Sequence, residues 1–176
     1  MSILRPVVPA EEPLGFEIRA VAPGEAEQAG EIVLAAYRSL PCDVLGDGYG
    51  GRLRDVAART AGATVLVAVD GDRVLGSVTL VDDPASPWSE SLVAGEIGIR
   101  MLGVDPAAGG RGVGTALVSE CLARGRALGA ARAVLHTTKD MTVAHRIYRR
   151  AGFLRAPERD VLLPGFHLMA FTLALG

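Results

Sequence analysis

One short segment of the sequence has a composition suited to binding an anion, the run Gly109-Gly-Arg-Gly-Val-Gly-Thr115. It follows a turn at Asp105-Pro106 and opens a stretch with helical character, so its backbone N–H groups have no partners within the helix. These groups point outward at the positive end of the helix dipole, and glycine lets a bulky anion approach the backbone itself. The segment therefore predicts a cradle for phosphate or pyrophosphate groups.

Two familiar nucleotide-binding motifs match this segment only in part. Gly109 and Gly114-Thr115 have the spacing of a nucleoside-triphosphate loop, but the lysine that should precede Thr115 is absent. The dinucleotide fingerprint needs glycine or alanine at position 115 or 117, where the sequence has Thr115 and Leu117. A nucleotide-binding protein and a glycine-rich turn without a ligand remain as alternatives to an anion site of another kind.

The other reactive side chains give fewer signals. Cys121 lies in the middle of a predicted helix among Leu117, Val118 and Leu122, which indicates packing rather than a nucleophile. No spacing of cysteine and histidine residues is typical of a metal site, so we expect no metal.

The elements that must position the cradle follow an order typical of an α/β (α+β) protein. Hydrophobic periodicity and turn residues predict strands at 16–21, 64–69, 73–81, 94–104, 133–137, 153–154 and 166–175, and helices at 24–39, around 53–57, at 112–128 and at 140–151. Asp140 is the expected N-cap of the last helix, and Asp70-Gly71-Asp72 the turn of a hairpin. Gly98 and Gly103 inside a strand predict a bulge or a close backbone approach.

Length and composition exclude several classes of protein. A chain of 176 residues, 49% hydrophobic and 22% charged, suits one globular domain, which we expect at 16–176 after an N-terminal tail at 1–15. The longest apolar run, 65–69, is far shorter than a membrane span, and the N-terminus has no signal-peptide core. Two cysteines make no disulfide framework, so a cytoplasmic location is expected.

Charge is distributed unevenly along the chain. The net charge of −2 argues against a nucleic-acid partner, and nothing indicates a membrane partner. Residues 1–99 carry 7 arginines and 15 acidic residues, a net charge of −8, whereas residues 100–176 carry 11 basic and 5 acidic residues, a net charge of +6. This asymmetry predicts that one side of the protein binds an anion and the other attracts a cation.

The cradle and the strand before it resemble motif A of the GNAT acetyltransferase superfamily, in which a Leu-x-Val strand end precedes (Gln/Arg)-x-x-Gly-x-(Gly/Ala). Leu102, Val104, Gly112 and Gly114 match this pattern. Gly109 stands at the Gln/Arg position, where it loses a side chain but keeps its backbone donor.

A second resemblance lies about 30 residues downstream. The segment Ala144-His-Arg-Ile-Tyr148-Arg-Arg-Ala-Gly-Phe153 is similar to the family's motif B helix, with Tyr148 and Gly152-Phe153 at matching positions and Met141 at the usual asparagine. The two motifs are confined to about 94–153, whereas the order of strands and helices agrees over about 16–175.

The resemblance implies the GNAT fold, with a mixed central sheet of about six to seven strands, two of them parallel and splayed, and about four helices. It implies acetyl-CoA as co-substrate, lying between the strands at 94–104 and 133–137. The pantetheine arm would pair with the first of these strands. The implied cofactor-binding residues are Leu102, Gly103, Val104, Gly109, Gly110, Arg111, Gly112, Val113, Gly114, Thr115, Ala144 and Tyr148, with Arg111 supplying the charge missing at Gly109.

The implied reaction is N-acetyl transfer by direct attack of an amine on the thioester. A backbone N–H near Leu102 would hold the oxyanion, and Tyr148 would protonate the leaving thiolate, since a phenol is protonated at neutral pH. The alternative role for Tyr148 is a core tyrosine. Glu96 and His136 are the two candidates for general base, against the alternatives of a solvated strand-edge residue and a hydrogen-bonded core histidine.

The acceptor is the least determined component. A small-molecule or peptide amine is expected, with specificity set by the loops at 41–51 and 82–93 and by the last strands. The acidic N-terminal half favours a cationic amine. A homodimer is left open, and so is a catalytically idle acyl-CoA-binding or interaction module, because Gly109 and Met141 depart from the motifs.

Overall fold

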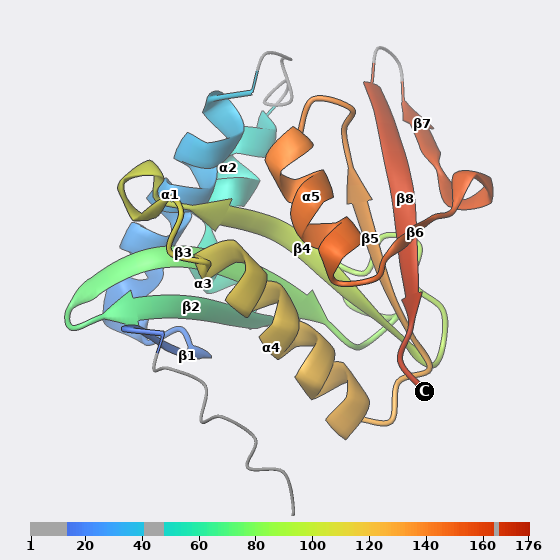
Figure 1. Ribbon diagram of the computed structural model, residues 1–176, viewed down its shortest axis with the longest axis horizontal. Coiled ribbons are helices and arrows are strands. Elements are labelled where there is room, and N and C mark those ends of the chain that lie inside the picture. The colour runs from blue at the N-terminus through green and yellow to red at the C-terminus, as the bar shows by residue number, and fades with distance from the viewer. Residues whose placement is uncertain (1–13, 41–47, 164–165) are drawn as a thin grey trace, which may run out of the picture.

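A single mixed sheet organises the chain in the computed structural model, which describes residues 14–40, 48–163 and 166–176 (Figure 1). The strand order is β1-β2-β3-β4-β5-β8-β6, with β7 paired to β8. The strands are β1 Glu17–Ala20, β2 Thr64–Asp70, β3 Arg73–Val81, β4 Glu96–Val104, β5 Arg132–Thr137, β6 Leu154–Arg155, β7 Val161–Leu163 and β8 Phe166–Ala174. The α-helices are α1 Ala26–Arg38, α2 Tyr49–Arg54, α3 Val56–Thr60, α4 Val113–Ala127 and α5 Thr142–Arg150, and the 3-10 helices include η3 Pro106–Ala108 and η4 Pro157–Arg159.

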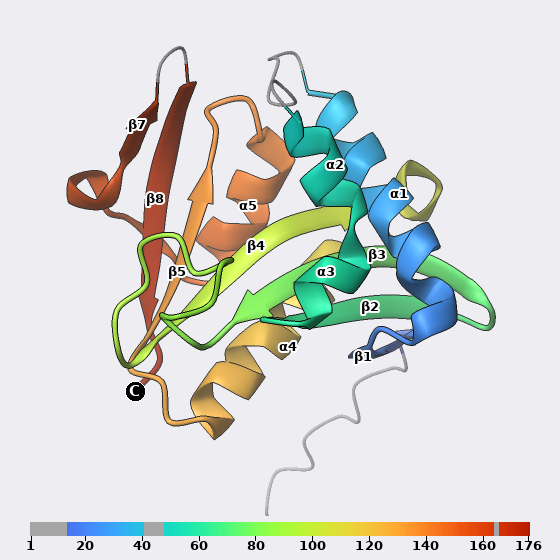
Figure 2. The same cartoon turned by 180° about the vertical axis from the view of Figure 1, so that it is seen from behind.

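Helices cover both faces of the sheet. Helices α4 and α5 lie on one face, and α1, α2 and α3 lie on the other (Figures 1 and 2). The largest core cluster joins the α4 face to the central strands through residues such as Leu117, Val118 and Leu135. Because both faces are covered, β2 and β3 are buried almost throughout, as expected for strands in the middle layer of an α/β protein.

The predicted fold class is confirmed, with differences in detail. The sheet has eight strands and the described residues form five α-helices, because β7 was not predicted and the second helix is broken. The break falls at Asp55, whose carboxylate accepts from the Ala58 N–H at 2.9 Å and so caps a new helix. The hairpin turn is confirmed, since Asp70 pairs with Arg73 around a left-handed Gly71.

The expected N-cap of α5 was wrong. Met141 holds that position and the helix begins at Thr142, whose N–H donates to the Asp140 carbonyl at 2.9 Å. Residues 1–13 of the predicted tail and residues 41–47 of the predicted acceptor loop lie outside the described part of the chain. Among the described residues, no helix has the length and apolar character needed to cross a bilayer.

Strands β4 and β5 are parallel, and they pair over only part of their length. The register joins Glu96 to Arg132 and continues as far as Ile99 and Leu135. Beyond that point β4 runs on to Val104 beside β3, while β5 remains paired to β8 up to Thr137. The predicted splay is therefore present, and it leaves one edge of residues 100–104 without a strand partner.

A bulge lies in β4 at the splay. Ser77 and Thr79 of β3 pair with Gly103 and Arg100, so three steps along β4 match two along β3, and Met101 has a φ of 51°. Arg100 and Met101 consequently both face the α1–α3 side, whereas Leu102 packs against the α4 core. Gly103 meets the prediction of a close approach, because a Cβ there would lie 2.7 Å from the Val33 Cα of α1.

Candidate active site

The glycine-rich cradle lies where β4 leads into α4. Asp105 accepts from the Ala107 N–H at 2.9 Å and starts η3, after which Gly110 and Gly112 take left-handed conformations that glycine accommodates. Within the described residues, the N–H groups of 112–115 donate to no acceptor; the first helical bond runs from Ala116 to Gly112. The cradle thus presents consecutive unused donors, as an anion site requires.

Packing around the cradle brings several predicted cofactor residues together. A Cβ on Gly114 would lie 2.8 Å from Ile147 Cδ1 and 3.5 Å from Val104 Cγ2, so α4 begins in close contact with α5 and the end of β4. Leu102 and Val104 are half-buried on the unpaired edge of β4, and Ala144 is half-buried on α5.

Arg111 is turned toward the first strands. Its Nη2 donates to the Gly15 carbonyl at 3.1 Å and lies 3.0 Å from the Asp70 carboxylate, and its guanidinium lies over the Phe16 ring at 5.8 Å. Asp70 therefore neutralises part of the charge that the cofactor was expected to use, and this role of Arg111 stays a prediction.

Tyr148 lies on α5 and is buried in the main core, with its ring 5.9 Å from that of Phe153. Burial raises the pKa of Tyr148 well above its usual range, against a smaller opposing effect of the Arg100 charge. The phenol is therefore protonated at any working pH. Cys121 is fully buried, and burial raises the pKa of its thiol to about 12, in keeping with a packing role.

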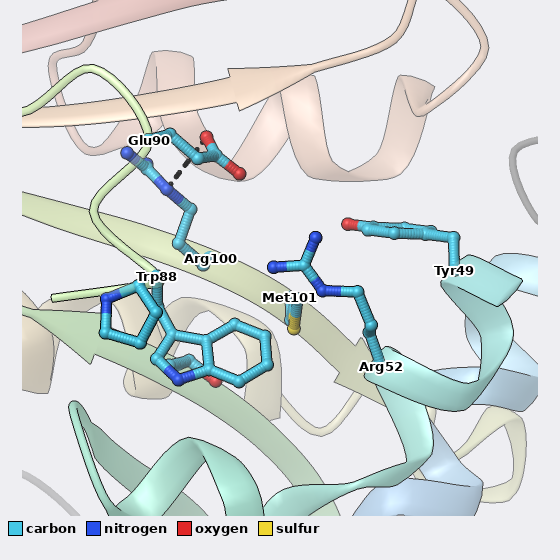
Figure 3. A pocket seen from close by; sticks show the side chains of 8 residues that line it. Tyr49, Arg52, Trp88, Glu90, Arg100 and Met101 are labelled. Atoms are coloured by element: carbon cyan, nitrogen blue, oxygen red, sulfur yellow. Dashed lines mark ion pairs between the residues drawn. The ribbon is translucent and has the colours of Figure 1, made fainter.

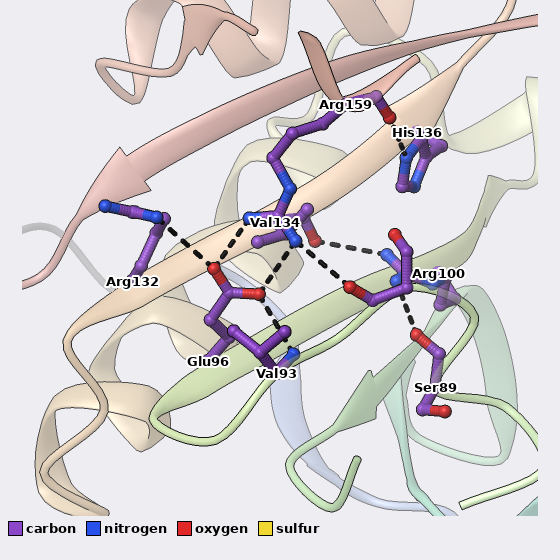
Figure 4. A network of polar contacts seen from close by, with 9 residues as sticks. Ser89, Val93, Glu96, Arg100, Arg132, Val134, His136 and Arg159 are labelled. Atoms are coloured by element: carbon purple, nitrogen blue, oxygen red, sulfur yellow. Dashed lines mark hydrogen bonds and ion pairs between the residues drawn. The ribbon is translucent and has the colours of Figure 1, made fainter. Parts of the chain in front are cut away.

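Glu96 is not brought together with the predicted catalytic residues. Its carboxylate accepts from Arg159 at 2.6 and 2.9 Å and from the Val93 N–H at 3.2 Å, with Arg132 at 3.4 Å (Figure 4). The hydrogen bond from Arg159 is the main reason that the pKa of Glu96 lies below its ordinary value. The residue stands at the paired end of β4, six positions and about 20 Å of strand before Leu102. This placement argues against Glu96 as the base.

His136 lies at the splayed end of β5, where it is nearly enclosed. Its Nε2 is 3.1 Å from the Arg159 carbonyl oxygen, and its Nδ1 is 3.4 Å from the Glu90 carboxylate. The second candidate base therefore contacts a carboxylate that was not predicted from the sequence.

A cavity of about 180 Å³ opens beside the bulge on the α1–α3 side, and we call it the Trp88 cavity (Figure 3). Its lining residues come from α2, β3, β4 and the loop between β3 and β4: Tyr49, Arg52, Thr79, Pro87, Trp88, Glu90, Arg100 and Met101. The long loop at 82–93 was expected to shape the acceptor site, and it supplies Trp88 and Glu90. Two arginines and one glutamate line the cavity, so the acidic excess of the N-terminal half is not reproduced there.

Arg100 links that loop to the sheet through hydrogen bonds and an ion pair. Its Nη atoms donate to the carbonyls of Ile99, Val134 and Ser89 at 3.1–3.2 Å, and its Nε forms an ion pair with Glu90 at 3.0 Å. Sequence reasoning missed both residues of this pair. A signal existed for Arg100, because a charge between Ile99 and Met101 interrupts an apolar strand and must find partners when buried.

Comparison with known proteins places the chain in a family. Residues 33–153 match the model of the acetyltransferase (GNAT) family, and the chain belongs to that family. Within the described residues, no group of three or more histidine, cysteine, aspartate or glutamate side chains is arranged to hold a metal ion.

Two similar curated proteins are named mycothiol acetyltransferases. The one from Geodermatophilus obscurus is 37% identical over 145 residues, which cover 81% of this chain and 46% of the relative. The one from Sanguibacter keddieii is 39% identical over 151 residues, covering 81% and 44%. The chain thus spans a little less than half the length of these relatives.

Solved structures agree with the fold. A GNAT acetyltransferase of Brucella melitensis in complex with acetyl-CoA has a TM-score of 0.62 and 26% identity, with 92% of this chain and 88% of that chain covered. A GNAT acetyltransferase of Staphylococcus aureus Mu50 has a TM-score of 0.68 at 15% identity, covering 92% and 99%, and shows the shared fold.

Proposed function

We propose that this chain transfers the acetyl group of acetyl-CoA to a primary amine by direct attack in a ternary complex. The observation that carries the proposal is the combination of an unpaired β4 edge with the unused N–H groups that begin α4. Membership of the GNAT family supports it, as does the Brucella melitensis relative solved with acetyl-CoA.

Each part of acetyl-CoA then has a place on the chain. The pyrophosphate would accept hydrogen bonds from the backbone of 112–115, since the N–H groups of Gly109 and Arg111 already donate to the Pro106 and Ala108 carbonyls. The pantetheine arm would add to the free edge of Leu102, Gly103 and Val104 as an extra strand would. The thioester would lie at the splay, between the α4 side and the Trp88 cavity, and the amine would approach from that cavity.

The reaction needs two groups besides the base. The bulge turns the backbone at Leu102 out of the regular ladder, and its N–H would stabilise the oxyanion of the tetrahedral intermediate. Tyr148 would face the departing sulfur. Because its pKa is raised, complete proton transfer to a thiolate of pKa near 8.5 is unfavourable, and its main contribution would be a donated hydrogen bond.

The relatives favour one acceptor for the first assay. Both are named mycothiol acetyltransferases, so the amine precursor of mycothiol heads a panel that also holds peptide N-termini and small alkylamines. A cytoplasmic location and a homodimer remain predictions.

Release of free CoA thiol tests the function. We expect thiol release with at least one amine, and Tyr148→Phe should lower turnover by about 10²-fold while acetyl-CoA affinity changes less than threefold. Thr60→Val, which removes a side-chain hydroxyl at an exposed position of α3, is the control. Thermal stabilisation by acetyl-CoA without any thiol release would favour the idle binding module instead.

A further inference from the structure

Glu90 is held in the Trp88 cavity at some conformational cost. It is one of two described non-glycine residues with positive φ, at 55°, a left-handed conformation that persists only where its surroundings enforce it. The enforcing contact is Arg100, whose Nε lies 3.0 Å from the Glu90 carboxylate while its other nitrogens bind the backbone on both sides. The backbone strain and the ion pair together point the carboxylate at the cavity (Figure 3).

The contacts of His136 fix where its proton lies. A carbonyl oxygen only accepts hydrogen bonds, so the Nε2 atom next to the Arg159 carbonyl carries a hydrogen. Nδ1 faces the Glu90 carboxylate at 3.4 Å, a long contact, and has no other hydrogen-bond partner among the described residues. A bare Nδ1 and an ionised carboxylate would present lone pairs to each other, so the arrangement is favourable when one proton lies between them.

Other residues around the Trp88 cavity carry polar groups that would suit a polar ligand. Thr79 and Trp88 line it, and the Thr79 hydroxyl and the Trp88 indole N–H are buried without a hydrogen-bond partner within the described chain. Arg52 lies over the Trp88 ring at 4.9 Å and contributes a cation at the rim. Buried polar groups without partners are costly unless a ligand or water satisfies them.

We propose that Glu90 and His136 form the proton-accepting dyad of the transferase. Glu90 touches the acceptor amine, and His136 positions Glu90 and helps to keep its carboxylate ionised. This inference rests on the proposed acetyl transfer. The acceptor ammonium gives one proton to the dyad, and the free amine forms a C–N bond to the thioester carbon as the C–S bond breaks. The second proton lost by the nitrogen ends on the CoA sulfur, and the dyad returns the first to solvent.

Charged or titratable side chains on four neighbouring elements face Glu90. They are Arg100 on β4, His136 on β5, Arg52 and Tyr49 on α2, and Tyr37 on α1. Burial by itself would raise the pKa of Glu90, but the hydrogen bond with His136 and the positive charges of Arg100 and Arg52 outweigh it and hold the pKa below its ordinary value. The carboxylate is therefore ionised at neutral pH and attracts an ammonium group.

Glu90→Gln tests the dyad through its pH profile. At pH 7 we expect kcat/KM to fall by about 10²–10³-fold, with acetyl-CoA affinity unchanged. The deficit should shrink as the pH approaches the pKa of the acceptor amine, because an amine that is already free needs no base. Glu27→Gln, the same change at an exposed position of α1, should leave the rate unaltered. An equal deficit at every pH, or none, would overturn the base.

Two substitutions of His136 separate proton transfer from positioning. In His136→Gln the amide nitrogen replaces Nε2 and keeps the contact to Arg159, whereas in His136→Asn it replaces Nδ1 and keeps a donor toward Glu90. Neither amide exchanges a proton in this pH range, so both variants should lose about tenfold in kcat and show a shifted pH profile. Full recovery of the rate and the profile in His136→Asn would show that His136 only positions Glu90.

A readout without turnover covers the case in which Glu90→Gln does not fold. Carboxyl ¹³C NMR of the otherwise intact chain should show the Glu90 titration midpoint moving to higher pH in His136→Gln, because the partner that lowers its pKa is gone. An unmoved midpoint contradicts the dyad. A wild-type chain that acetylates no amine overturns the transferase and the base together, whereas an active wild type with an unaltered Glu90→Gln profile overturns the base alone.

Discussion

Two carboxylates near the same strand, Glu96 buried and Glu90 partly exposed, are in opposite situations. Glu96 stands where β4 and β5 are paired, and two arginines and a backbone N–H occupy its carboxylate. Glu90 stands where the strands have separated, on a strained backbone, and faces a cavity with one arginine and one histidine as partners. Arg159 connects the two sites. Its guanidinium binds Glu96, and its carbonyl accepts a hydrogen bond from His136, the residue that contacts Glu90 (Figure 4).

The difference separates a structural carboxylate from a reactive one. A carboxylate whose acceptor sites are filled has no capacity left for a substrate proton, and removing it leaves cations buried without a partner. A carboxylate with free capacity, held by strain at a cavity, costs stability and is maintained for a ligand. Glu96 should therefore matter to folding, and Glu90 to turnover.

The largest effect is expected from Glu96→Gln. It removes the counter-charge of Arg159 and Arg132 at a side chain that is 4% exposed, so the free energy of unfolding should fall by about 3 kcal/mol in urea denaturation. Turnover per folded molecule should stay within twofold of wild type. Glu120→Gln breaks a half-exposed pair with Arg124 on α4 and should cost under about 1 kcal/mol. A stable Glu96→Gln protein without activity would reverse the assignment of the two glutamates.

Gly103→Ala tests whether the splayed end also contains purely structural positions. Its Cβ would lie 2.7 Å from the Cα and 3.3 Å from the N of Val33, and the backbone of α1 must shift to make room. We expect a loss of about 2 kcal/mol in unfolding free energy. Gly24→Ala, where a Cβ meets nothing within 4 Å, is the control. Equal stability of the two variants would show that α1 can move away from β4 freely.

Acid conditions should selectively destabilise the end of the sheet at which β4 and β5 are paired. The pKa of Glu96 is lowered on folding, mainly by the hydrogen bond from Arg159, so the unfolded chain binds the proton first. The stability that this glutamate contributes is complete above its unfolded pKa of about 4.3 and is lost as the pH falls from that value through the lower pKa of the folded state. The difference in unfolding free energy between wild type and Glu96→Gln should therefore shrink steadily as the pH is lowered below about 4.3. A difference that does not change with pH would exclude the ion pair as its source.

Local patterns predicted much of the fold, including the form of the glycine-rich loop that opens α4. The Asp70-Gly71-Asp72 turn, the glycine cradle and the face of α4 each depend on neighbours a few residues apart, and the structure reproduces them. The predicted N-cap of α5 was wrong because the prediction rested on a single residue type. Strand β7 was missed because three residues are too few to show the alternation of apolar and polar side chains that identifies a strand.

The acceptor side could not be predicted in the same way. Glu90 and His136 are 46 positions apart in the sequence and meet only because the strands splay and Arg100 fastens the loop beside them. Glu96 was selected for its place on the cofactor strand, but its partner Arg159 is 63 positions away. Spacing along the chain carries no information about which of two glutamates such distant arginines will neutralise.

The smallest effect is expected from Arg111→Ala, in the cradle at the splayed end. The guanidinium is exposed and bound to Asp70 and the Gly15 carbonyl, and surface pairs of this kind contribute under about 1 kcal/mol. If the unused backbone donors of 112–115 hold the pyrophosphate, the dissociation constant for acetyl-CoA measured by calorimetry should rise by less than threefold. In Asp70→Asn the freed guanidinium should tighten binding slightly, in the opposite direction. A tenfold loss in Arg111→Ala would instead mean that acetyl-CoA draws Arg111 away from Asp70, and that the side chain, rather than the backbone, replaces the charge missing at Gly109.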